Sequence, residues 1–481
     1  MTWESSLPLT LAATLKRRLK ANNFKRKQSM KRKIQLTFIS TLLFATTSLA
    51  RQSDNIISRQ VDSLLNDAFA KGIFTGAVII SHNSENVYYK QFGFADWKTE
   101  TLFDKNTLFN IASLNKQFTE EIIHQLVAEN KLLYTDNLSK HLDIFPRETG
   151  NKITVQQLLD MKAGLGDYLR NPKFGELQFI DYSLAELIDI IKAEPLQYEP
   201  GTSQQYSNSG YVVLGALIEK ITNLSYEINL HDRIVKPLGL EKFYYSMAEK
   251  AKQMNRAYGT EINFEGDKMS FDDISNSSPA GGIYTSIGNL LKFTEAKLKN
   301  TLPSGKRYGS GMFAGGTPFW NATISYNEKN GFAFVVMANT GNISDELAPR
   351  INSIIKNDPY PPLDLPFNRS LYKMIKEKGF DYVKVNAEKL AEQARVPYDA
   401  RFLNFFGYQF LFGNKKDIAI NLFKINVELF PKEANTYDSL AEAYLEIGDK
   451  INALKYYKLE LQLVPNNEKV KTVITNLKHA K

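Results

Sequence analysis

Ser113 and Lys116 lie three residues apart in the stretch FNIASLNKQFTEEII, at the start of a segment with helical apolar periodicity. Residues i and i+3 share one face of a helix, so the lysine amine would lie over the serine hydroxyl. A serine hydroxyl is a poor nucleophile at neutral pH and needs a base within hydrogen-bond reach. Lysine can be that base if burial lowers its pKa. The pair therefore predicts a nucleophile beside its base.

The Ser-x-x-Lys spacing alone does not identify an active site. The same spacing recurs at Ser353 with Lys356 and at Ser370 with Lys373, where nothing else in the sequence supports a site. A serine at a helix start is most often an N-cap, which accepts a hydrogen bond from the first helical turn. The N-cap interpretation of Ser113 therefore stays open on this spacing alone.

Two further polar residues, Tyr206 and Asn208, lie directly before an apolar helix in the stretch YEPGTSQQYSNSGYVVLGALIEK. The stretch ITVQQLLDMKAGLGDY precedes them in the chain, and the stretch SPAGGIYTSIGNLLKF follows them. With Ser113 and Lys116, these stretches resemble the serine β-lactamase and penicillin-binding-protein superfamily. The resemblance is to its class C-like branch, which includes family VIII esterases and D-amino-acid peptidases, and it covers about residues 53–340.

The resemblance implies an acyl-enzyme mechanism in which each of these residues has a role. Ser113 would be acylated and then released by water, with Lys116 as its base. Tyr206 would relay the proton or protonate the leaving group, and Asn208 would orient Lys116 or the substrate amide. The backbone N–H of Ser113 would form half of an oxyanion hole. The expected substrate is a small ester, amide or peptide.

The third motif of the family is altered in this chain. The family has Lys or His, then a small residue and glycines on a strand. The matching stretch is GMFAGGTPFWNA, with Phe313 at the cationic position and Gly315 and Gly316 retained. Gly316 could still offer its N–H as the second oxyanion donor. Phe313 cannot pair with a substrate carboxylate, and the span from Pro279 to this strand is shorter than the family usually has.

The altered motif leaves two interpretations open. One is an esterase or D-amino-acid peptidase that is not an efficient β-lactamase. The other is a catalytically weakened binding protein that works through its pocket and its C-terminal repeats. The intact Ser113, Lys116 and Tyr206 favour the enzyme, whereas Phe313 favours the binding protein.

Two predicted hairpins and the helices between them must position these residues. Strands are predicted at 76–81 and 86–92, and a second hairpin, whose turn holds Asn330 and Gly331, is predicted in NATISYNEKNGFAFVVMANT. Helical periodicity covers 113–129, 155–162, 184–192 and 210–222. Strands at both ends with helices between favour an α/β (α+β) fold. We expect one antiparallel sheet flanked by helices, an all-helical insert, and a cleft between sheet and insert.

The chain changes character after Thr340. Proline is concentrated in NDPYPPLDLPFN, which is typical of a linker. Beyond it, FGYQFLFGNKKDIAINLFKINVELFP aligns with AEAYLEIGDKINALKYYKLELQLVP, with a period that resembles tetratricopeptide repeats. The recurring pairs are Ala419 and Ala453, Pro431 and Pro465, and Gly413 and Gly448. The glycine spacing exceeds the others by one and predicts an extra loop residue. The repeats either bind a protein partner or form a stabilising helical appendage.

Basic residues are concentrated at the N-terminus. Residues 1–33 hold ten Lys or Arg and one acid, so the net charge of +8 leaves about −1 for the rest. Nucleic acid is therefore not an expected partner. From Met30, a basic segment, an uncharged run and a small residue at Ala50 predict a signal peptide at 30–50 and a periplasmic or secreted protein. An uncleaved anchor is the alternative, although the uncharged run is marginal for spanning a bilayer.

Other catalytic systems find little support. The sequence has no Gly-x-Ser-x-Gly elbow and no cysteine, which argues against an α/β-hydrolase triad and excludes a thiolate nucleophile and a disulfide framework. The histidines do not form a His-Glu-x-x-His pair, so neither a metal nor another cofactor is expected. We divide the chain into an extension and signal peptide (1–50), a β-lactamase-like hydrolase domain (51–345), a linker with helices (346–398) and tetratricopeptide-like repeats (399–481).

Overall fold

The computed structural model describes residues 52–177, 182–272 and 276–479. The chain divides into two units, one ending at Leu64 and the other beginning at Leu65. Residues 52–64 of the first unit are helical, and so are residues 65–70 of the second. The predicted signal peptide and the extension before it lie outside the described residues. Within the described ranges, no helix is both long enough and apolar enough to cross a membrane.

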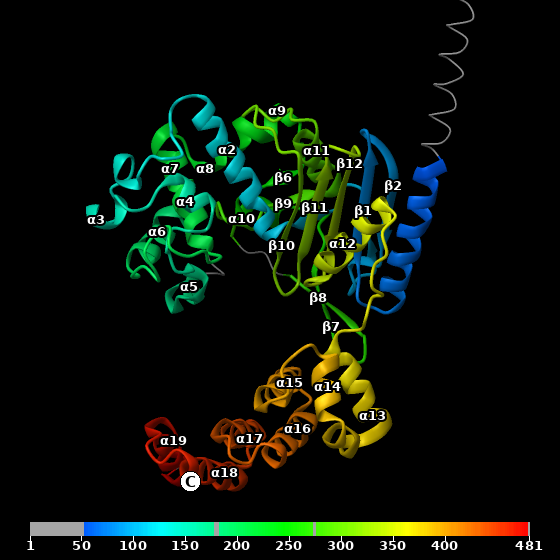
Figure 1. The fold of residues 1–481 in the computed structure, drawn as a ribbon, viewed down its shortest axis with the longest axis vertical. Helices are drawn as coiled ribbons and strands as arrows, with labels where there is room; N and C mark the ends of the chain where they lie inside the picture. Colours follow the sequence, from blue (N-terminus) through cyan, green and yellow to red (C-terminus); the bar gives the residue numbers. More distant parts are fainter. Residues whose placement is uncertain (1–51, 178–181, 273–275, 480–481) are drawn as a thin grey trace, which may run out of the picture. The chain divides into compact units, whose positions relative to one another are not determined.

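A five-stranded antiparallel sheet forms the centre of the second unit (Figure 1), in the order β10-β11-β12-β1-β2. Its strands are β1 (Gly76–His82), β2 (Glu85–Phe92), β10 (Ser310–Gly316), β11 (Asn321–Asn327) and β12 (Phe332–Ala338). Gly76 pairs with Ala338, so β1 lies beside β12 although they are far apart in the sequence. The predicted antiparallel sheet, built from two distant hairpins, is therefore confirmed.

The two faces of the sheet carry different helices, because side chains alternate along a strand. Ile324 of β11 belongs to a buried cluster with Leu290 and Phe293 of α11 (Ile287–Leu298). The neighbouring Thr323 hydroxyl lies 2.8 Å from the Ser344 hydroxyl of α12 (Ile343–Lys356). Helices α11 and α12 therefore cover opposite faces (Figure 1).

The chain between β5 (Leu108–Asn110) and β9 (Tyr284–Ser286) supplies the helical insert. Its elements are η1 (Ala112–Asn115), α2 (Lys116–Ala128), η2 (Leu138–Lys140), α3 (Arg147–Gly150), α4 (Val155–Leu159), η3 (Tyr168–Arg170), α5 (Pro172–Leu177), α6 (Leu184–Lys192), α7 (Asn208–Thr222), α8 (Tyr226–Leu230), η4 (His231–Val235), α9 (Lys236–Leu238), β6 (Phe243–Tyr244), α10 (Met247–Ala251), β7 (Gly259–Ile262) and β8 (Lys268–Phe271). Strands β5, β9 and β6 form a small sheet, and the short strands β3 (Phe94–Asp96) and β4 (Thr101–Leu102) form a hairpin.

Local sequence explains where two of these helices begin and end. Helix α6 has the predicted bounds because Ser183 and Glu186 form a reciprocal capping box at its start. Helix α4 is shorter than the predicted 155–162. Met161 takes a left-handed backbone conformation, with φ of 59°, which is incompatible with continuing a right-handed helix.

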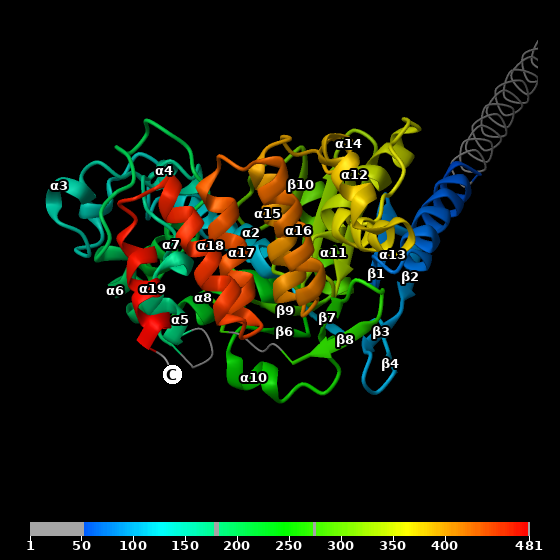
Figure 2. The same ribbon diagram turned by 90° about the horizontal axis from the view of Figure 1, so that it is seen from below.

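The C-terminal part is helical and has a buried cluster of its own. Its helices are α13 (Phe367–Val385), α14 (Ala387–Gln393), α15 (Ala400–Phe412), α16 (Lys416–Leu429), α17 (Ala434–Glu446), α18 (Lys450–Leu463) and α19 (Glu468–His479). Figure 2 shows α15 to α18 as successive, roughly parallel rods. Helices α17 and α18 begin and end 34 positions after α15 and α16. The spacing agrees with the predicted period, and the assignment to tetratricopeptide repeats stays a prediction.

The prediction of one extra loop residue is wrong. Each helix pair is joined by three residues, 413–415 and 447–449. The left-handed residue is Asn414, with φ of 57°, in the first loop and Gly448, with φ of 79°, in the second. Both residue types tolerate this conformation. Gly448 therefore corresponds to Asn414 rather than to Gly413, and the two loops have equal length.

Candidate active site

The start of α2 brings Ser113 and Lys116 together. Ser113 lies in the 3-10 turn η1, which leads directly into α2, and Lys116 Nζ donates to Ser113 Oγ at 3.0 Å. The N-cap residues of η1 and α2 are Ile111 and Asn115, and neither makes a side-chain capping bond. Ser113 is therefore not an N-cap, and that interpretation is wrong. Its hydroxyl is directed at the lysine amine instead.

Ala112, immediately before Ser113, has a left-handed backbone with φ of 45°. For a residue with a side chain this conformation costs about 1 kcal/mol. Two hydrogen bonds hold it: Ala112 N donates to Asn110 Oδ1 at 2.8 Å, and Gly282 N donates to the Ala112 carbonyl at 3.2 Å. The strained turn was not predicted, because an alanine gives no sequence signal for left-handed backbone.

Lys116 is a buried amine surrounded by neutral acceptors. Its side chain is 5% exposed, and Nζ donates to Asn208 Oδ1 at 2.7 Å and to the Ala280 carbonyl at 2.6 Å, besides Ser113. Burial lowers the pKa of Lys116 to about 7, against the opposing effect of the Asp167 carboxylate. A substantial fraction of Lys116 is therefore neutral at neutral pH and able to accept a proton.

Tyr206 brings a second hydroxyl to Ser113. Its OH lies 2.7 Å from Ser113 Oγ and donates to Asn208 Oδ1 at 3.3 Å. Burial of the hydroxyl and the nearby Asp167 raise the pKa of Tyr206, although the hydrogen bond with Ser113 opposes them. The hydroxyl is therefore protonated at neutral pH and can donate or relay a proton. The residue as a whole is 53% exposed, so this side of the site is open to solvent.

Asn208 is the first residue of α7, and its amide is held from both ends. Its Oδ1 accepts from Lys116, while its Nδ2 donates to Asp167 Oδ2 at 2.9 Å. Asn208 therefore orients Lys116, one of the two roles that the resemblance implied. Asp167 and Ala280 were not among the predicted site residues. Asp167 stands inside the block ITVQQLLDMKAGLGDY, but no local pattern connects it with Asn208.

Strand β10 passes beside Ser113 at Gly315. A Cβ atom at this glycine would lie 2.6 Å from the Ser113 backbone nitrogen, so only glycine permits this approach. The Gly315 carbonyl accepts from Asn321 Nδ2 of β11 at 3.2 Å. The peptide is trans, so the Gly316 N–H points away from β11, toward the free edge of the sheet. This orientation fits the oxyanion role predicted for Gly316.

Phe313 faces the same side of β10 as Gly315 because the two residues are two positions apart on the strand. Its partly exposed ring stacks with Tyr326, with 6.3 Å between centroids. The ammonium of Lys297, from α11, lies 5.0 Å from the Phe313 ring centroid. The position where the family has a cation is therefore aromatic, with a cation next to it from another element. Lys297 lies four positions after the stretch SPAGGIYTSIGNLLKF, and no local pattern connects it with Phe313.

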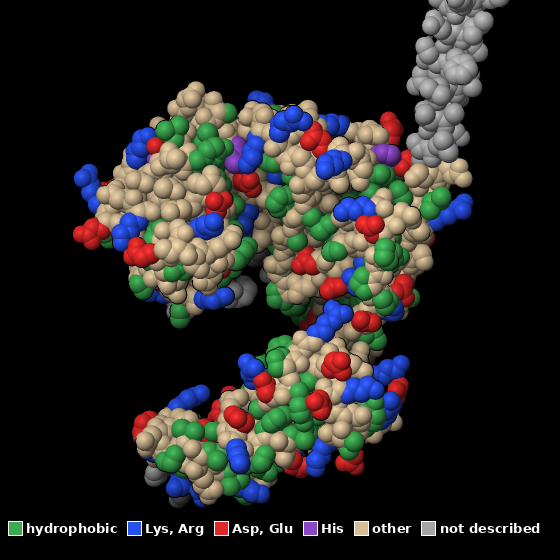
Figure 3. Space-filling model, in the orientation of Figure 1, with side chains coloured by type: hydrophobic (Ala, Val, Ile, Leu, Met, Phe, Trp, Pro, Cys, Tyr) green, Lys and Arg blue, Asp and Glu red, His purple; other side chains and the backbone are tan. Residues whose placement is uncertain are grey.

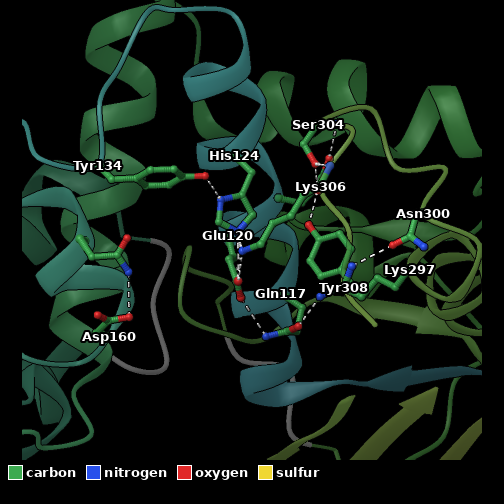
Figure 4. Close-up of polar contacts among 12 residues, drawn as sticks. Gln117, Glu120, His124, Tyr134, Asp160, Lys297, Asn300, Ser304, Lys306 and Tyr308 are labelled. Carbon is green, nitrogen blue, oxygen red and sulfur yellow. Dashed lines mark hydrogen bonds and ion pairs between the residues drawn. The ribbon is translucent and has the colours of Figure 1, made fainter. Parts of the chain in front are cut away.

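A second polar cluster continues along α2 (Figure 4). His124 Nδ1 lies 2.8 Å from the Tyr134 hydroxyl, and its Nε2 lies 3.1 Å from Glu120 Oε1 and 2.5 Å from Lys306 Nζ. Figure 3 shows charged side chains and a histidine along a hollow between the helical insert and the part of the molecule that contains the five-stranded sheet. Nowhere in the described ranges do three or more His, Cys, Asp or Glu side chains form a group able to hold a metal.

Comparison with known proteins gives the fold and its family. The family model described as Beta-lactamase matches residues 54–353. Protein flp of Staphylococcus aureus (strain MW2) is 24% identical over 331 residues, 62% of this chain and 65% of the relative. The chain thus spans less than two thirds of that relative.

Two solved structures share the fold. The octameric penicillin-binding protein homologue from Pyrococcus abyssi aligns with a TM-score of 0.57 and 22% identity, over 66% of this chain and 81% of its own. The D-amino acid amidase from Ochrobactrum anthropi SV3, complexed with L-phenylalanine amide, aligns with a TM-score of 0.53 and 21% identity, over 64% and 99%. With the family model covering more than half of its length, the chain belongs to the Beta-lactamase family.

Proposed function

We propose that the protein is a serine hydrolase that forms an acyl-enzyme on Ser113 and acts on esters or amides of small neutral acyl groups. The observation that carries this proposal is the Ser113 hydroxyl, 3.0 Å from Lys116 Nζ and 2.7 Å from the Tyr206 hydroxyl. Acyl transfer needs a nucleophile, a base and a proton carrier within hydrogen-bond reach of one another. These residues meet that need.

In acylation, neutral Lys116 accepts the Ser113 proton while Oγ attacks the carbonyl carbon of the substrate. The tetrahedral intermediate then collapses and the bond to the leaving group breaks. The leaving group takes the hydroxyl proton of Tyr206, and the Lys116 ammonium returns a proton to the Tyr206 oxygen. Asn208 supports this transfer because its Oδ1 accepts from both groups.

In deacylation, water attacks the acyl-enzyme carbonyl and gives its proton to Lys116. The bond to Ser113 Oγ breaks, the acid leaves, and Lys116 returns the proton to the serine. In both steps the backbone N–H groups of Ser113 and Gly316 donate to the negatively charged oxygen of the tetrahedral intermediate and stabilise it. The closeness of Gly315 to the Ser113 nitrogen supports this pairing of donors.

Phe313 supports a preference for neutral substrates. A charge-assisted hydrogen bond to a substrate carboxylate contributes roughly 1.5 to 3 kcal/mol, and a phenyl ring cannot make one. β-Lactams and peptide C-termini carry such a carboxylate, so we expect slow or absent β-lactam hydrolysis. The likeness to a D-amino acid amidase supports amides without a carboxylate, besides esters, as a substrate class.

A second candidate function is a binding protein with weakened catalysis, and Phe313 is the observation that favours it. The experiment that separates the two is hydrolysis of an activated short-chain ester by the purified protein and by Ser113→Ala. We expect turnover that Ser113→Ala abolishes. Equal turnover by both proteins would contradict the proposed nucleophile, and tight binding without any turnover would establish the second candidate.

We also propose export to the periplasm or the medium, on the pattern of charge and apolar residues at 30–50. The expected N-terminus of the recovered protein is Arg51, which N-terminal sequencing would identify. A cytoplasmic protein that retains residues 1–29 would contradict this proposal.

A further inference from the structure

Thr119 is a buried polar residue of α2 that the proposed reaction does not use. The residue is fully buried, and its Oγ1 donates to the Pro279 carbonyl at 2.6 Å. A threonine inside a helix often donates to a carbonyl of its own helix, as Thr294 of α11 does to Leu290 at 2.7 Å. Thr119 instead binds a segment that is far from it in the sequence. Its hydrogen bond therefore connects α2 with that segment.

Tyr226 fixes the direction of this hydrogen bond. Its hydroxyl lies 2.6 Å from Thr119 Oγ1. A threonine hydroxyl has one proton, and Thr119 gives it to Pro279, so Tyr226 must be the donor in its contact with Thr119. Burial raises the pKa of Tyr226, so its hydroxyl keeps the proton at neutral pH. A directed chain of hydrogen bonds therefore runs from Tyr226 through Thr119 to the Pro279 carbonyl.

Pro279 lies in a β-turn with the sequence SPAG. Gly281 N donates to the Ser278 carbonyl at 3.0 Å and closes this turn. Serine, proline and glycine are favoured at the first, second and fourth positions of a type I turn, so the sequence explains its formation. The central peptide of the SPAG turn is held at both ends. Thr119 binds its carbonyl, and its N–H, from Ala280, donates to Ser278 Oγ at 3.2 Å.

The SPAG turn also contacts the base and the nucleophile. The Ala280 carbonyl accepts from Lys116 at 2.6 Å, and a Cβ atom at Gly281 would lie 3.6 Å from the Ser113 nitrogen. Lys116 and Thr119 lie three positions apart on one face of α2, and they bind adjacent carbonyls of the turn. The Thr119 bond therefore helps to hold the Ala280 carbonyl within reach of Lys116.

We propose that Thr119 is a positioning residue, which acts through the SPAG turn to keep the Ala280 carbonyl in place and the Lys116 amine beside the Ser113 hydroxyl. The inference rests on the proposed function, because Lys116 is the base of that reaction. Without the Thr119 hydroxyl, the buried Pro279 carbonyl loses its donor and the turn is released from the helix. Lys116 then loses an acceptor that orients its amine and favours its ammonium form.

The test is the hydrolysis of a neutral activated ester as a function of pH. Thr119→Val removes the hydroxyl and keeps the branched shape of the side chain. It should lower kcat by roughly ten- to hundred-fold, with KM changed by less than about threefold, because a displaced base transfers protons poorly. The pH midpoint of kcat/KM should fall, because the neutral form of Lys116 becomes easier to reach. Thr119→Ser, which restores the hydroxyl, should recover most of kcat and the original midpoint.

Thr294→Val is the matched control. Thr294 is as buried as Thr119, but its hydroxyl binds its own helix. Its replacement should lower the temperature of unfolding by a similar amount and leave the pH midpoint unchanged. Thr119→Cys replaces Thr119→Val if the valine variant does not fold, because a thiol is a weak donor. The kcat and midpoint of the unmutated protein in Thr119→Val, or the same loss in both threonine variants without a shifted midpoint, would overturn the inference.

Absence of turnover by the unmutated protein would instead contradict the proposed function. The pKa of Lys116, followed by NMR of its isotopically labelled side chain, would then test the inference separately. Thr119→Val should lower this pKa, and Thr119→Ser should leave it unchanged. In that case, an unchanged pKa in Thr119→Val would overturn the inference.

Discussion

Lys116 and Lys297 are both buried, and burial lowers the pKa of both, to about 7 and about 8. Their surroundings differ. Lys116 has three oxygen acceptors, one of them the Ser113 hydroxyl. Lys297 has one amide acceptor, Gln117, with aromatic rings around it, and the charges of Glu120 and Glu121 favour its ammonium form. A lowered pKa alone therefore does not make a lysine a base. The base is the lysine with a nucleophile in reach, and the other lysine can act only through its charge.

The contrast between the two lysines can be tested by replacing each of them by methionine, and the replacement of Lys116 has the largest expected effect on kcat/KM. Lys116→Met should reduce kcat/KM for a neutral ester by roughly three to five orders of magnitude, because members of a catalytic unit fail together. Lys297→Met should change it by less than about threefold, because the hydrogen bond of its ammonium goes to Gln117 and not to the Ser113 hydroxyl. Steady-state kinetics on purified proteins would measure both. Comparable losses in the two variants would break the contrast.

Removal of the Tyr206 hydroxyl should have the next largest effect. Tyr206→Phe should lower kcat for a neutral ester by roughly two to three orders of magnitude, the usual contribution of a positioned proton donor. An ester with a much better leaving group should lose less, because it needs no proton. The same loss on both esters would show that Tyr206 acts only by positioning Ser113.

A cation at position 313 should have a moderate and selective effect. Phe313→His should raise kcat/KM for a carboxylate-bearing ester by about one to two decades and leave the neutral ester nearly unchanged. Kinetics on the matched pair of esters would measure this change. Equal gains on both substrates, or brisk β-lactam hydrolysis by the unmutated protein, would show that Phe313 does not set specificity.

The smallest effect concerns pH. Lys116 must be neutral to accept a proton, so kcat/KM for a neutral ester should rise with pH and level off above a pKa of about 7. The Asp167 carboxylate favours the ammonium form, so Asp167→Asn should lower the pKa of Lys116 and move the rise to lower pH. The asparagine oxygen can still accept from Asn208, so the activity on the plateau should change little. A shift to higher pH would contradict this account.

The parts of the site that could be predicted from the sequence are those with a local pattern. Ser113 and Lys116 share a helix turn, Tyr206 and Asn208 lie two positions apart at the start of α7, and the Gly315–Gly316 pair marks a close approach of backbone. Strand alternation and helical periodicity likewise gave the sheet and the insert. The residues of each pattern lie within a few positions of one another, so the pattern can be recognised in the sequence without knowledge of the fold.

The missed residues reach the site only through tertiary structure. The Asp167 carboxylate and the Ala280 carbonyl come from segments with no motif that links them to Lys116. The conformation of Ala112 depends on contacts with Asn110 and Gly282, which no alanine pattern reveals. Lys297 stands in an ordinary amphipathic helix, and its closeness to Phe313 follows from the way α11 packs on the sheet.

Covalent labelling tests the central claim, nucleophilic attack by Ser113, most directly. The protein would be incubated with a fluorophosphonate that acylation-competent serines attack, and peptide mass spectrometry would locate the adduct. The account predicts one adduct on Ser113, formed faster as pH rises toward 8 and absent from Ser113→Ala. An adduct on another residue, or turnover of esters without labelling of Ser113, would contradict it.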